Sequence, residues 1–206
     1  MRLTSKYNLG KLYPTVASEW HPTKNEELTP YNLAPKSSRK VWWRCDQGHE
    51  WEAAISSRTS GKNCLYCSGK YPSEGYNLAI QYPNLTKEWH PTKNEQITPF
   101  EVTPGSGKKV WWQCTKNHEW RASVTGRTRG NNCPYCSNRL PSKDNNLAVL
   151  HPNVAKEWHP TLNKELTPFD VVLGSHKRVW WICDKGHEWQ AVVRDRVRGS
   201  KCRQCN

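Results

Sequence analysis

Cysteine and histidine recur in this chain at spacings that suit a metal ion. Each set reads Cys-x3-His, then fourteen residues, then Cys-x2-Cys, and it occurs three times with a step of 69 residues. The ligands are Cys45, His49, Cys64, Cys67, Cys114, His118, Cys133, Cys136, Cys183, His187, Cys202 and Cys205. Closed structural zinc sites use four Cys and His ligands in a tetrahedron. We therefore predict three structural Zn²⁺ ions per chain and no catalytic metal.

The cysteine count disfavours disulfides. All nine cysteines belong to the three sets, and three thiols cannot all pair within one unit. Metal thiolates in a reducing, cytoplasmic compartment fit better. The sequence has no apolar run of the ~20 residues that span a bilayer, and its first residues lack the apolar core of a signal peptide. We expect neither a membrane segment nor secretion.

The repeat divides the chain into three tandem zinc modules, at residues 1–69, 70–138 and 139–206. Units of this length have a marginal hydrophobic core and commonly need a metal. The pattern predicts small α+β modules, each with a short helix and loop half followed by a zinc-bound β-hairpin. We expect no small-molecule substrate site.

The second half of each unit has the pattern of a hairpin. Val41-Trp42-Trp43 is a β-branched and aromatic run, and residues 49–55 alternate with Trp51, Ala53 and Ile55 on one face. Gly, Asn and Gly precede the three histidine ligands. These residues accept a left-handed backbone, so we expect a positive φ there that folds the cysteine and the histidine onto one metal.

The first half predicts a short helix and a turn. Asn8 can cap a turn, Pro14 suits a first helical position, and His21-Pro22 ends the helix. Thr29-Pro30 begins another turn, with Leu33 and an aromatic residue in each copy expected to be apolar anchors. These aromatic residues are Tyr31, Phe100 and Phe169.

A second histidine also recurs, in the motif Glu-Trp-His-Pro-Thr. It is His21, His90 or His159, far from the cysteines in sequence. We favour His49-type ligation on spacing. The recurring His21 position is then interpreted as a histidine that packs and fixes the turn.

The tryptophans supply most of the large apolar volume, with four in each unit. Trp42 and Trp43 point to opposite faces of a strand, and Trp43 shares a face with Cys45. Trp43 should therefore pack near the metal. Trp42 either covers the helix half or stands open to stack on a base, and burial is favoured for all four because aliphatic residues are few.

The chain is strongly basic. Its formal charge is +13, and the three units carry +4, +4 and +5. Each site of three thiolates and one Zn²⁺ subtracts one charge, which leaves about +10. Polyanions are the natural partners of such a surface, and we expect nucleic acid, with DNA favoured over RNA.

Two basic features repeat and are the candidate phosphate contacts. One precedes the tryptophan pair, and the other lies in the loop before the second cysteine pair. The residues are Arg39, Lys40, Lys108, Lys109, Lys177 and Arg178 in the first, and Arg58, Lys62, Arg127, Arg129, Arg194, Arg196 and Arg198 in the second. Such groups predict backbone contacts and salt-dependent binding. Alternatively, Arg58 and its equivalents pair with Glu50 or Glu19 and are structural.

The chain resembles a family described as a "probable zinc-ribbon" domain of unknown function, found in bacteria and some viruses and often in tandem. The resemblance rests on Asn-Leu-Ala, Glu-Trp-His-Pro, Thr-Pro, Val-Trp-Trp-x-Cys, Gly-His-Glu-Trp, Arg-x-x-Gly and Cys-Pro-x-Cys between Asn77 and Cys136. Asn117 replaces the glycine of this pattern, and Leu65 and Arg203 replace its last proline in the other copies, without removing a ligand. It covers all three units. It implies a zinc-ribbon or treble-clef module, occasional linkage to nuclease-like domains, and hence a DNA-related role with a protein partner such as a nuclease.

The choice between a zinc ribbon and a treble clef concerns the last two ligands. A treble clef places them at the start of a helix, and the third copy ends at Asn206, one residue after Cys205. On this ground we favour the ribbon, with the treble clef as the alternative.

Three classes of function remain. The favoured one is a non-enzymatic nucleic-acid-binding protein. The second is a protein-interaction adaptor or inhibitor built of zinc modules. The third, an enzyme, is disfavoured because we find no catalytic triad, phosphate loop or open metal position.

Overall fold

The computed structural model describes residues 3–205. The chain forms two compact units. One extends to Lys87 and adds Asn94–Lys108, and the other holds Glu88–Lys93 and the chain from Lys109 onward. The second repeat contributes to both units. The division into three separate domains therefore stays a prediction.

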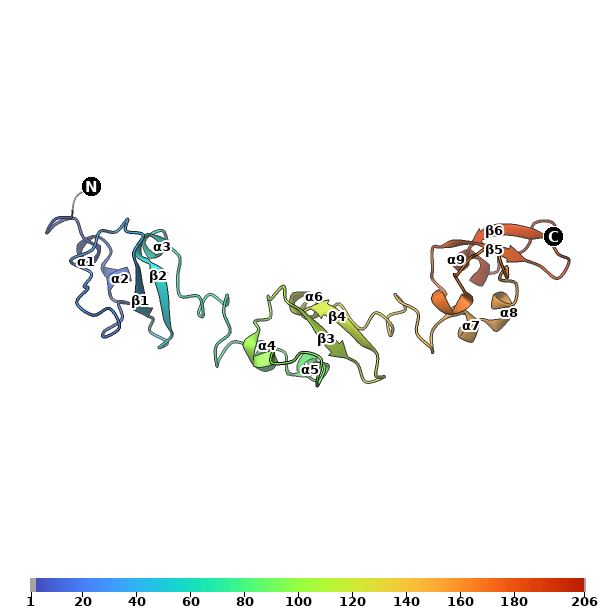
Figure 1. Ribbon diagram of the computed structural model, residues 1–206, viewed down its shortest axis with the longest axis horizontal. Helices are drawn as coiled ribbons and strands as arrows, with labels where there is room; N and C mark the ends of the chain where they lie inside the picture. The colour runs from blue at the N-terminus through green and yellow to red at the C-terminus, as the bar shows by residue number, and fades with distance from the viewer. Residues whose placement is uncertain (1–2, 206) are drawn as a thin grey trace. The chain divides into compact units, whose positions relative to one another are not determined.

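The first repeat is built from short elements (Figure 1). Two helices come first, α1 (Leu9–Leu12) and α2 (Pro14–Ala17). A β-hairpin follows, β1 (Lys40–Arg44) and β2 (Glu50–Ala54), and helix α3 (Ile55–Thr59) continues directly from its second strand. The same helices and strands recur in this order in the other two repeats, each of which adds a 3-10 helix before the hairpin.

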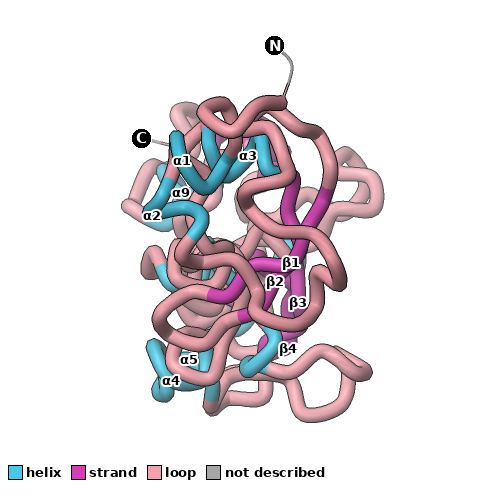
Figure 2. The backbone as a smooth tube through the Cα atoms, turned by 90° about the vertical axis from the view of Figure 1, so that its left-hand side faces the viewer, coloured by secondary structure: helices cyan, strands magenta, loops and turns pink. Residues whose placement is uncertain are grey.

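The second repeat contains α4 (Leu78–Gln81), α5 (Pro83–Thr86), the 3-10 helix η1 (Pro99–Glu101), β3 (Lys109–Gln113), β4 (Glu119–Ser123) and α6 (Val124–Thr128). The third contains α7 (Leu147–Leu150), α8 (Pro152–Ala155), η2 (Pro168–Asp170), β5 (Arg178–Ile182), β6 (Glu188–Val192) and α9 (Val193–Val197). Loops make up most of the tube in Figure 2, and the strands occur as short pairs.

The start of each repeat is fixed by local hydrogen bonds. The Asn8 side chain accepts a hydrogen bond from the Lys11 N–H at 2.9 Å and caps α1, while Pro14 occupies the first turn of α2. These assignments confirm the predicted cap and the predicted helix start. Proline suits this position because a first-turn N–H has no partner within the helix.

Strand pairing is antiparallel and sets which side chains face inward. Val41 pairs with Ala53 and Trp43 with Trp51. Val41, Trp43 and Trp51 are buried, so the predicted alternation is confirmed. Ile55 is also buried, but it begins α3 instead of extending the strand.

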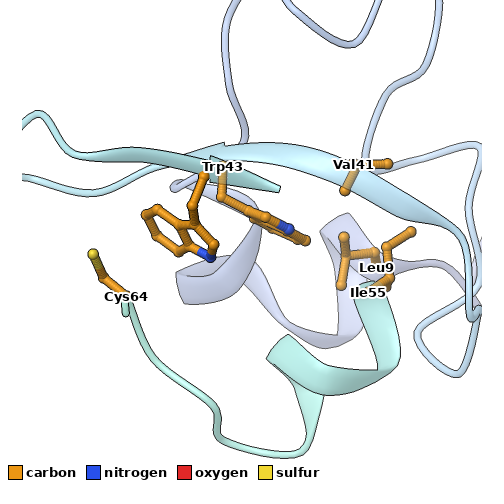
Figure 3. Close-up of a cluster of buried hydrophobic side chains, with 6 residues drawn as sticks. Leu9, Val41, Trp43, Ile55 and Cys64 are labelled. Carbon is orange, nitrogen blue, oxygen red and sulfur yellow. The ribbon is translucent and has the colours of Figure 1, made fainter. Parts of the chain in front are cut away.

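The core of the first repeat lies between the hairpin and the helices (Figure 3). Leu9, Val41 and Ile55 gather at one end, Cys64 lies at the other, and Trp43 lies between them. Trp43 is completely buried and its indole N–H donates to the Ala53 carbonyl at 3.0 Å. Two of the ligand cysteines, Cys64 and Cys45, therefore pack with the core, and the predicted place of Trp43 is confirmed.

The helix half is held to the hairpin by backbone bonds. The His21 N–H donates to the Trp42 carbonyl at 3.1 Å, and the Arg44 N–H donates to the Glu19 carbonyl at 2.7 Å. The Asn25 side chain bonds both the N–H and the carbonyl of Trp42, at 2.7 and 2.8 Å. Residues 19–21 thus complete the free edge of β1, which explains why this half repeats as faithfully as the ligand half.

Two sequence predictions for this half are wrong. Helix α2 ends at Ala17, before the predicted end at His21-Pro22, because Trp20 pairs with Trp43 in a β-bridge. The aromatic residue after Thr-Pro was expected to be an apolar anchor, but Tyr31, Phe100 and Phe169 are 62, 63 and 63% exposed. The turn itself forms as predicted. Leu33, the other predicted anchor, packs against the core, so that part of the prediction is confirmed.

Within residues 3–205, every helix is too short or too polar to cross a lipid bilayer.

Candidate metal centres and basic surface

The hairpin turn positions the first two ligands of each site. The Cys45 N–H donates to the His49 carbonyl at 3.1 Å, and the Gly48 N–H donates to the Cys45 carbonyl at 2.8 Å. Gly48 has φ 77°, Asn117 has φ 60° and Gly186 has φ 79°. The predicted left-handed residue before each histidine is confirmed, and it reverses the chain so that both ligands face one point.

The other two ligands lie on a single helical turn after α3. The Ser68 N–H donates to the Cys64 carbonyl at 3.0 Å, the i to i+4 bond of an α-turn. The Cys67 N–H points at the Cys64 sulfur at 3.5 Å. Cys64 is buried and Cys67 is exposed, so the site lies at the edge of the core.

The ligand atoms have the separations of a zinc tetrahedron. In the first repeat, His49 Nδ1 lies 3.5, 3.8 and 3.3 Å from the sulfurs of Cys45, Cys64 and Cys67, and the Cys45 and Cys67 sulfurs are 3.6 Å apart. Zn–S bonds of about 2.3 Å and a Zn–N bond of about 2.0 Å give tetrahedron edges of about 3.5 to 3.8 Å. The donor set therefore fits Zn²⁺, with histidine binding through Nδ1.

The second and third repeats reproduce this geometry. Cys114 and His118 Nδ1 are 3.5 Å apart, and so are Cys183 and His187 Nδ1. In each of the three groups all four ligand atoms lie within 4.8 Å of one another. The groups are Cys45, His49, Cys64, Cys67; Cys114, His118, Cys133, Cys136; and Cys183, His187, Cys202, Cys205.

The thiols of one site cannot all ionise without a cation. Burial, together with the neighbouring sulfurs of Cys45 and Cys64, raises the pKa of the Cys67 thiol to about 12. Burial also raises the pKa of Cys45, but N–H groups of Gln47 and His49 reverse this effect, and the net pKa falls. Cys45 is therefore the first thiolate, and a bound divalent cation would neutralise the charge of the others.

The recurring His21 position is not a ligand. His21 Nδ1 accepts hydrogen bonds from the N–H groups of Thr23 and Lys24 at 3.2 and 3.1 Å, and Nε2 lies 2.9 Å from a Glu50 oxygen. Nδ1 therefore acts as an acceptor, which leaves the ring proton to Nε2 on the side of the Glu50 carboxylate. The interpretation as a turn-fixing histidine is confirmed, and His90 and His159 make the same contacts.

Three of the predicted phosphate contacts are wrong because the side chains are buried. Arg58, Arg127 and Arg196 are only 4, 5 and 5% exposed. Arg58 donates to a Glu19 carboxylate oxygen and to the Lys62 carbonyl, and its guanidinium lies 5.4 and 5.3 Å from the ring centres of Trp43 and Trp51. The alternative, an ion pair with Glu19, describes these arginines.

The other candidate cations differ in their surroundings. Arg194 is half-buried and contacts His176 at 3.0 Å and Asp195 at 3.5 Å. The remaining candidates are exposed, namely Arg39, Lys40, Lys62, Lys108, Lys109, Arg129, Lys177, Arg178 and Arg198.

Sequence reasoning missed a lysine that covers the outer face of the hairpin. Lys24 Nζ lies 4.4 Å from the ring centre of Trp42 and 2.6 Å from Glu50. Lys93 makes the same contacts with Trp111 and Glu119. The signal was the repeated Lys-Asn that follows His-Pro-Thr, which is absent from the third repeat, where Leu162 stands instead. Trp42 is therefore half-buried under an ion pair and not an open stacking surface.

In each repeat a hairpin turn carries two zinc ligands, a short helix follows, and a helical turn carries the other two ligands. This arrangement defines the class of the protein as a tandem array of treble clef modules with structural zinc. The family described as "probable treble clef zinc finger domain" matches residues 16–70, 85–139 and 154–206, and the chain belongs to this family. The comparison with curated proteins found no match.

The preference for a zinc ribbon is corrected by this match. It assumed that the last two ligands need a full helix after them. One α-turn, closed by the bond from Ser68 to Cys64, is enough to present Cys64 and Cys67. The predicted α+β modules with a zinc-bound hairpin are confirmed.

Proposed function

We propose that this chain is a non-enzymatic nucleic-acid-binding protein, with DNA as its preferred partner, that contacts mainly the phosphate backbone. Zinc has a structural role in this proposal, because each site supplies four protein ligands and, in the first repeat, Cys64 and Cys45 pack with the core. The metal would hold the hairpin turn against the helical turn. The chain's own cations would make the contacts.

One observation carries the proposal. Two adjacent basic residues lie at the start of the first hairpin strand in all three repeats, and all six are exposed. No ion pair joins any of them to a carboxylate within residues 3–205. They are Arg39, Lys40, Lys108, Lys109, Lys177 and Arg178.

This pattern contrasts with the other repeated cations. Lys24 and Lys93 are paired with Glu50 and Glu119, and Arg58 is buried against Glu19. Within residues 3–205 the strand-start pair is exposed in every copy and makes no ion pair, although Lys108 and Lys177 lie close enough to Glu101 and Asp170 to help lower the pKa of those carboxyls. Since the chain is strongly basic overall, such groups would attract a polyanion and release its counterions.

The position of the pair also suits backbone contact. Lys40, Lys109 and Arg178 lie on the outward face of the hairpin, opposite the buried Val41, Val110 and Val179. A short, flat two-stranded surface with cations at one end offers no set of groups for reading bases. Three weakly binding repeats on one chain would gain affinity through effective concentration.

The test is a titration of the zinc-loaded chain with duplex DNA, single-stranded DNA and RNA at about 50 and 200 mM salt. We expect binding to all three, tightest to duplex DNA, with a steep loss of affinity at the higher salt. Absence of binding at the lower salt, or binding that does not depend on salt, would refute the proposal.

A further inference from the structure

The two residues between the last two cysteine ligands, called the turn pair below, differ between the repeats. In the first two repeats both members are half-buried, and the second member is a tyrosine. In the third repeat both members are polar and exposed. The turn pairs are Leu65 and Tyr66, Pro134 and Tyr135, and Arg203 and Gln204. Ligand types and spacing are the same in all three copies, so the centres differ only in what surrounds the metal position.

The tyrosine of the turn pair covers the histidine ligand. The ring centres of Tyr66 and His49 are 5.1 Å apart with 23° between their planes, and those of Tyr135 and His118 are 5.1 Å apart with 37°. Such a ring restricts rotation of the imidazole and shields one side of it from water. The hollow that borders His49 has the Tyr66 ring in its wall. Gln204 has no ring to place over the histidine of the third centre.

A cleft of about 460 Å³ lies beside the third centre. Its walls include the ligand Cys202, Trp189 and the turn pair. Trp189 is half-buried, whereas its equivalents Trp51 and Trp120 are only 4 and 6% exposed. In the first repeat the turn pair packs against the core that contains Trp51. The polar turn pair of the third repeat therefore leaves a ligand cysteine and its neighbouring tryptophan beside an open cleft.

The charge of Arg203 offsets this difference only weakly. A centre of three thiolates and one Zn²⁺ has a net charge of about −1, which a nearby guanidinium attracts. Arg203 is exposed, however, and water and salt screen such an attraction. The missing aromatic cover is the larger effect, because it acts directly on a ligand.

We propose that the third centre, formed by Cys183, His187, Cys202 and Cys205, is an exchangeable zinc site, whereas the other two centres retain their zinc. An aromatic pair changes an equilibrium constant by about 3- to 10-fold, so the third zinc should be held more weakly by about this factor. As free zinc falls, the third repeat would lose the metal that joins its hairpin to its last turn while the other two stay loaded. This inference concerns the metal centres alone and does not rest on the proposed function.

The test follows zinc release from the zinc-loaded full chain into an excess of a chromophoric chelator. We expect one zinc ion to leave at least ~3-fold faster than the other two. In Q204Y this ion should join the slow phase. Y66Q should do the reverse and give two fast ions and one slow ion. Y31Q is the matched control, because it changes an exposed tyrosine of the same repeat, and its release should match that of the wild type.

A further variant separates the ring from the shape of the turn. R203P gives the third repeat the proline of Cys-Pro-x-Cys but no ring, and it should leave the fast ion fast. Three equal release rates in the wild type, or a fast ion that persists in Q204Y, would overturn the proposal. So would removal of the fast phase by R203P alone, because the turn would then control release. Q204Y introduces the side chain that two repeats already carry, so the test stands even where Y66Q fails to fold.

Discussion

Arg58 and Glu19 join the two halves of the first repeat through a buried ion pair. The two residues are 39 positions apart, and the Arg58 guanidinium also lies between the rings of Trp43 and Trp51. The same arrangement joins Arg127 to Glu88 and Arg196 to Glu157. Because the guanidinium reaches the carbonyl of Lys62 as well, it ties the helix half, the hairpin and the chain leading to Cys64 together.

Removal of such an arginine should destabilise its repeat. In Arg127→Ala, Glu88 loses a partner at 2.5 Å, and the space between Trp112 and Trp120 is left empty. We expect the free energy of unfolding to fall by about 3 kcal/mol, the lower end for a broken buried pair because Glu88 is partly exposed. Thermal unfolding measures the change. Arg129→Ala, two residues away and exposed, is the control and should stay within about 0.5 kcal/mol of the wild type. Equal effects of the two variants would show that the pair has no structural role.

The residue before each histidine ligand should control zinc affinity. Gly48 has φ 77°, and a Cβ at this position would meet nothing within 4 Å, so Gly48→Ala adds only a conformational cost of about 1 kcal/mol. This corresponds to about 5-fold weaker zinc binding at one site, measurable by competition with a chromophoric chelator. Gly105→Ala has equal space and no positive φ, and it should change nothing measurable. Gly48→Asn should lie close to the wild type, since Asn117 adopts φ 60° at the equivalent place. An Ala variant with wild-type zinc affinity would contradict the role of the left-handed turn.

Acid should weaken the contact between Glu50 and the His21 turn. The pKa of Glu50 is lowered from 4.5 to about 2. The hydrogen bond from Lys24 contributes most to this shift, and the interaction with His21 is the next largest cause. A lowered folded-state pKa gives stability that is present above the unfolded-state pKa and is lost as pH falls through the folded-state value. The stability difference between wild type and Glu50→Gln should thus be constant above about pH 5 and vanish towards about pH 2. Comparing denaturant midpoints of the two chains at each pH cancels the acid release of zinc that they share. A difference that does not change with pH would exclude an ionised Glu50 as the cause.

The ligands and the hairpin could be predicted from sequence because their determinants are local. Four ligands at fixed spacing, a Gly or Asn before the histidine, and an alternating strand each specify geometry over a few residues. The place of Arg58 could not be predicted in the same way. A repeated arginine can bind a phosphate or pair with a buried carboxylate equally well. Which of the two occurs depends on the tertiary structure, which places Trp43 and Trp51 of the hairpin and Glu19 of the helix half around the same guanidinium.

Tyr31 shows a second limit. Thr29-Pro30 predicts a turn, and the turn forms, but a turn residue can face the core or the solvent with the same local sequence. Leu33 fills the core position, which leaves the ring outside. Helix α3 was missed because Ile55–Thr59 is a single short turn of helix without a sequence cap.

The central claim is that the strand-start cations bind nucleic acid, and the salt dependence of duplex DNA binding tests it most directly. The variant K40Q/K109Q/R178Q removes three exposed charges, and K11Q/K87Q/K156Q removes three exposed charges from the helix halves. Each phosphate contact contributes roughly 0.9 to the slope of log affinity against log salt. If the strand-start cations contact phosphates, the magnitude of this slope should fall by about 2 to 3 in K40Q/K109Q/R178Q. In K11Q/K87Q/K156Q the slope should remain near the wild-type value. Equal slopes for all three chains would contradict the account.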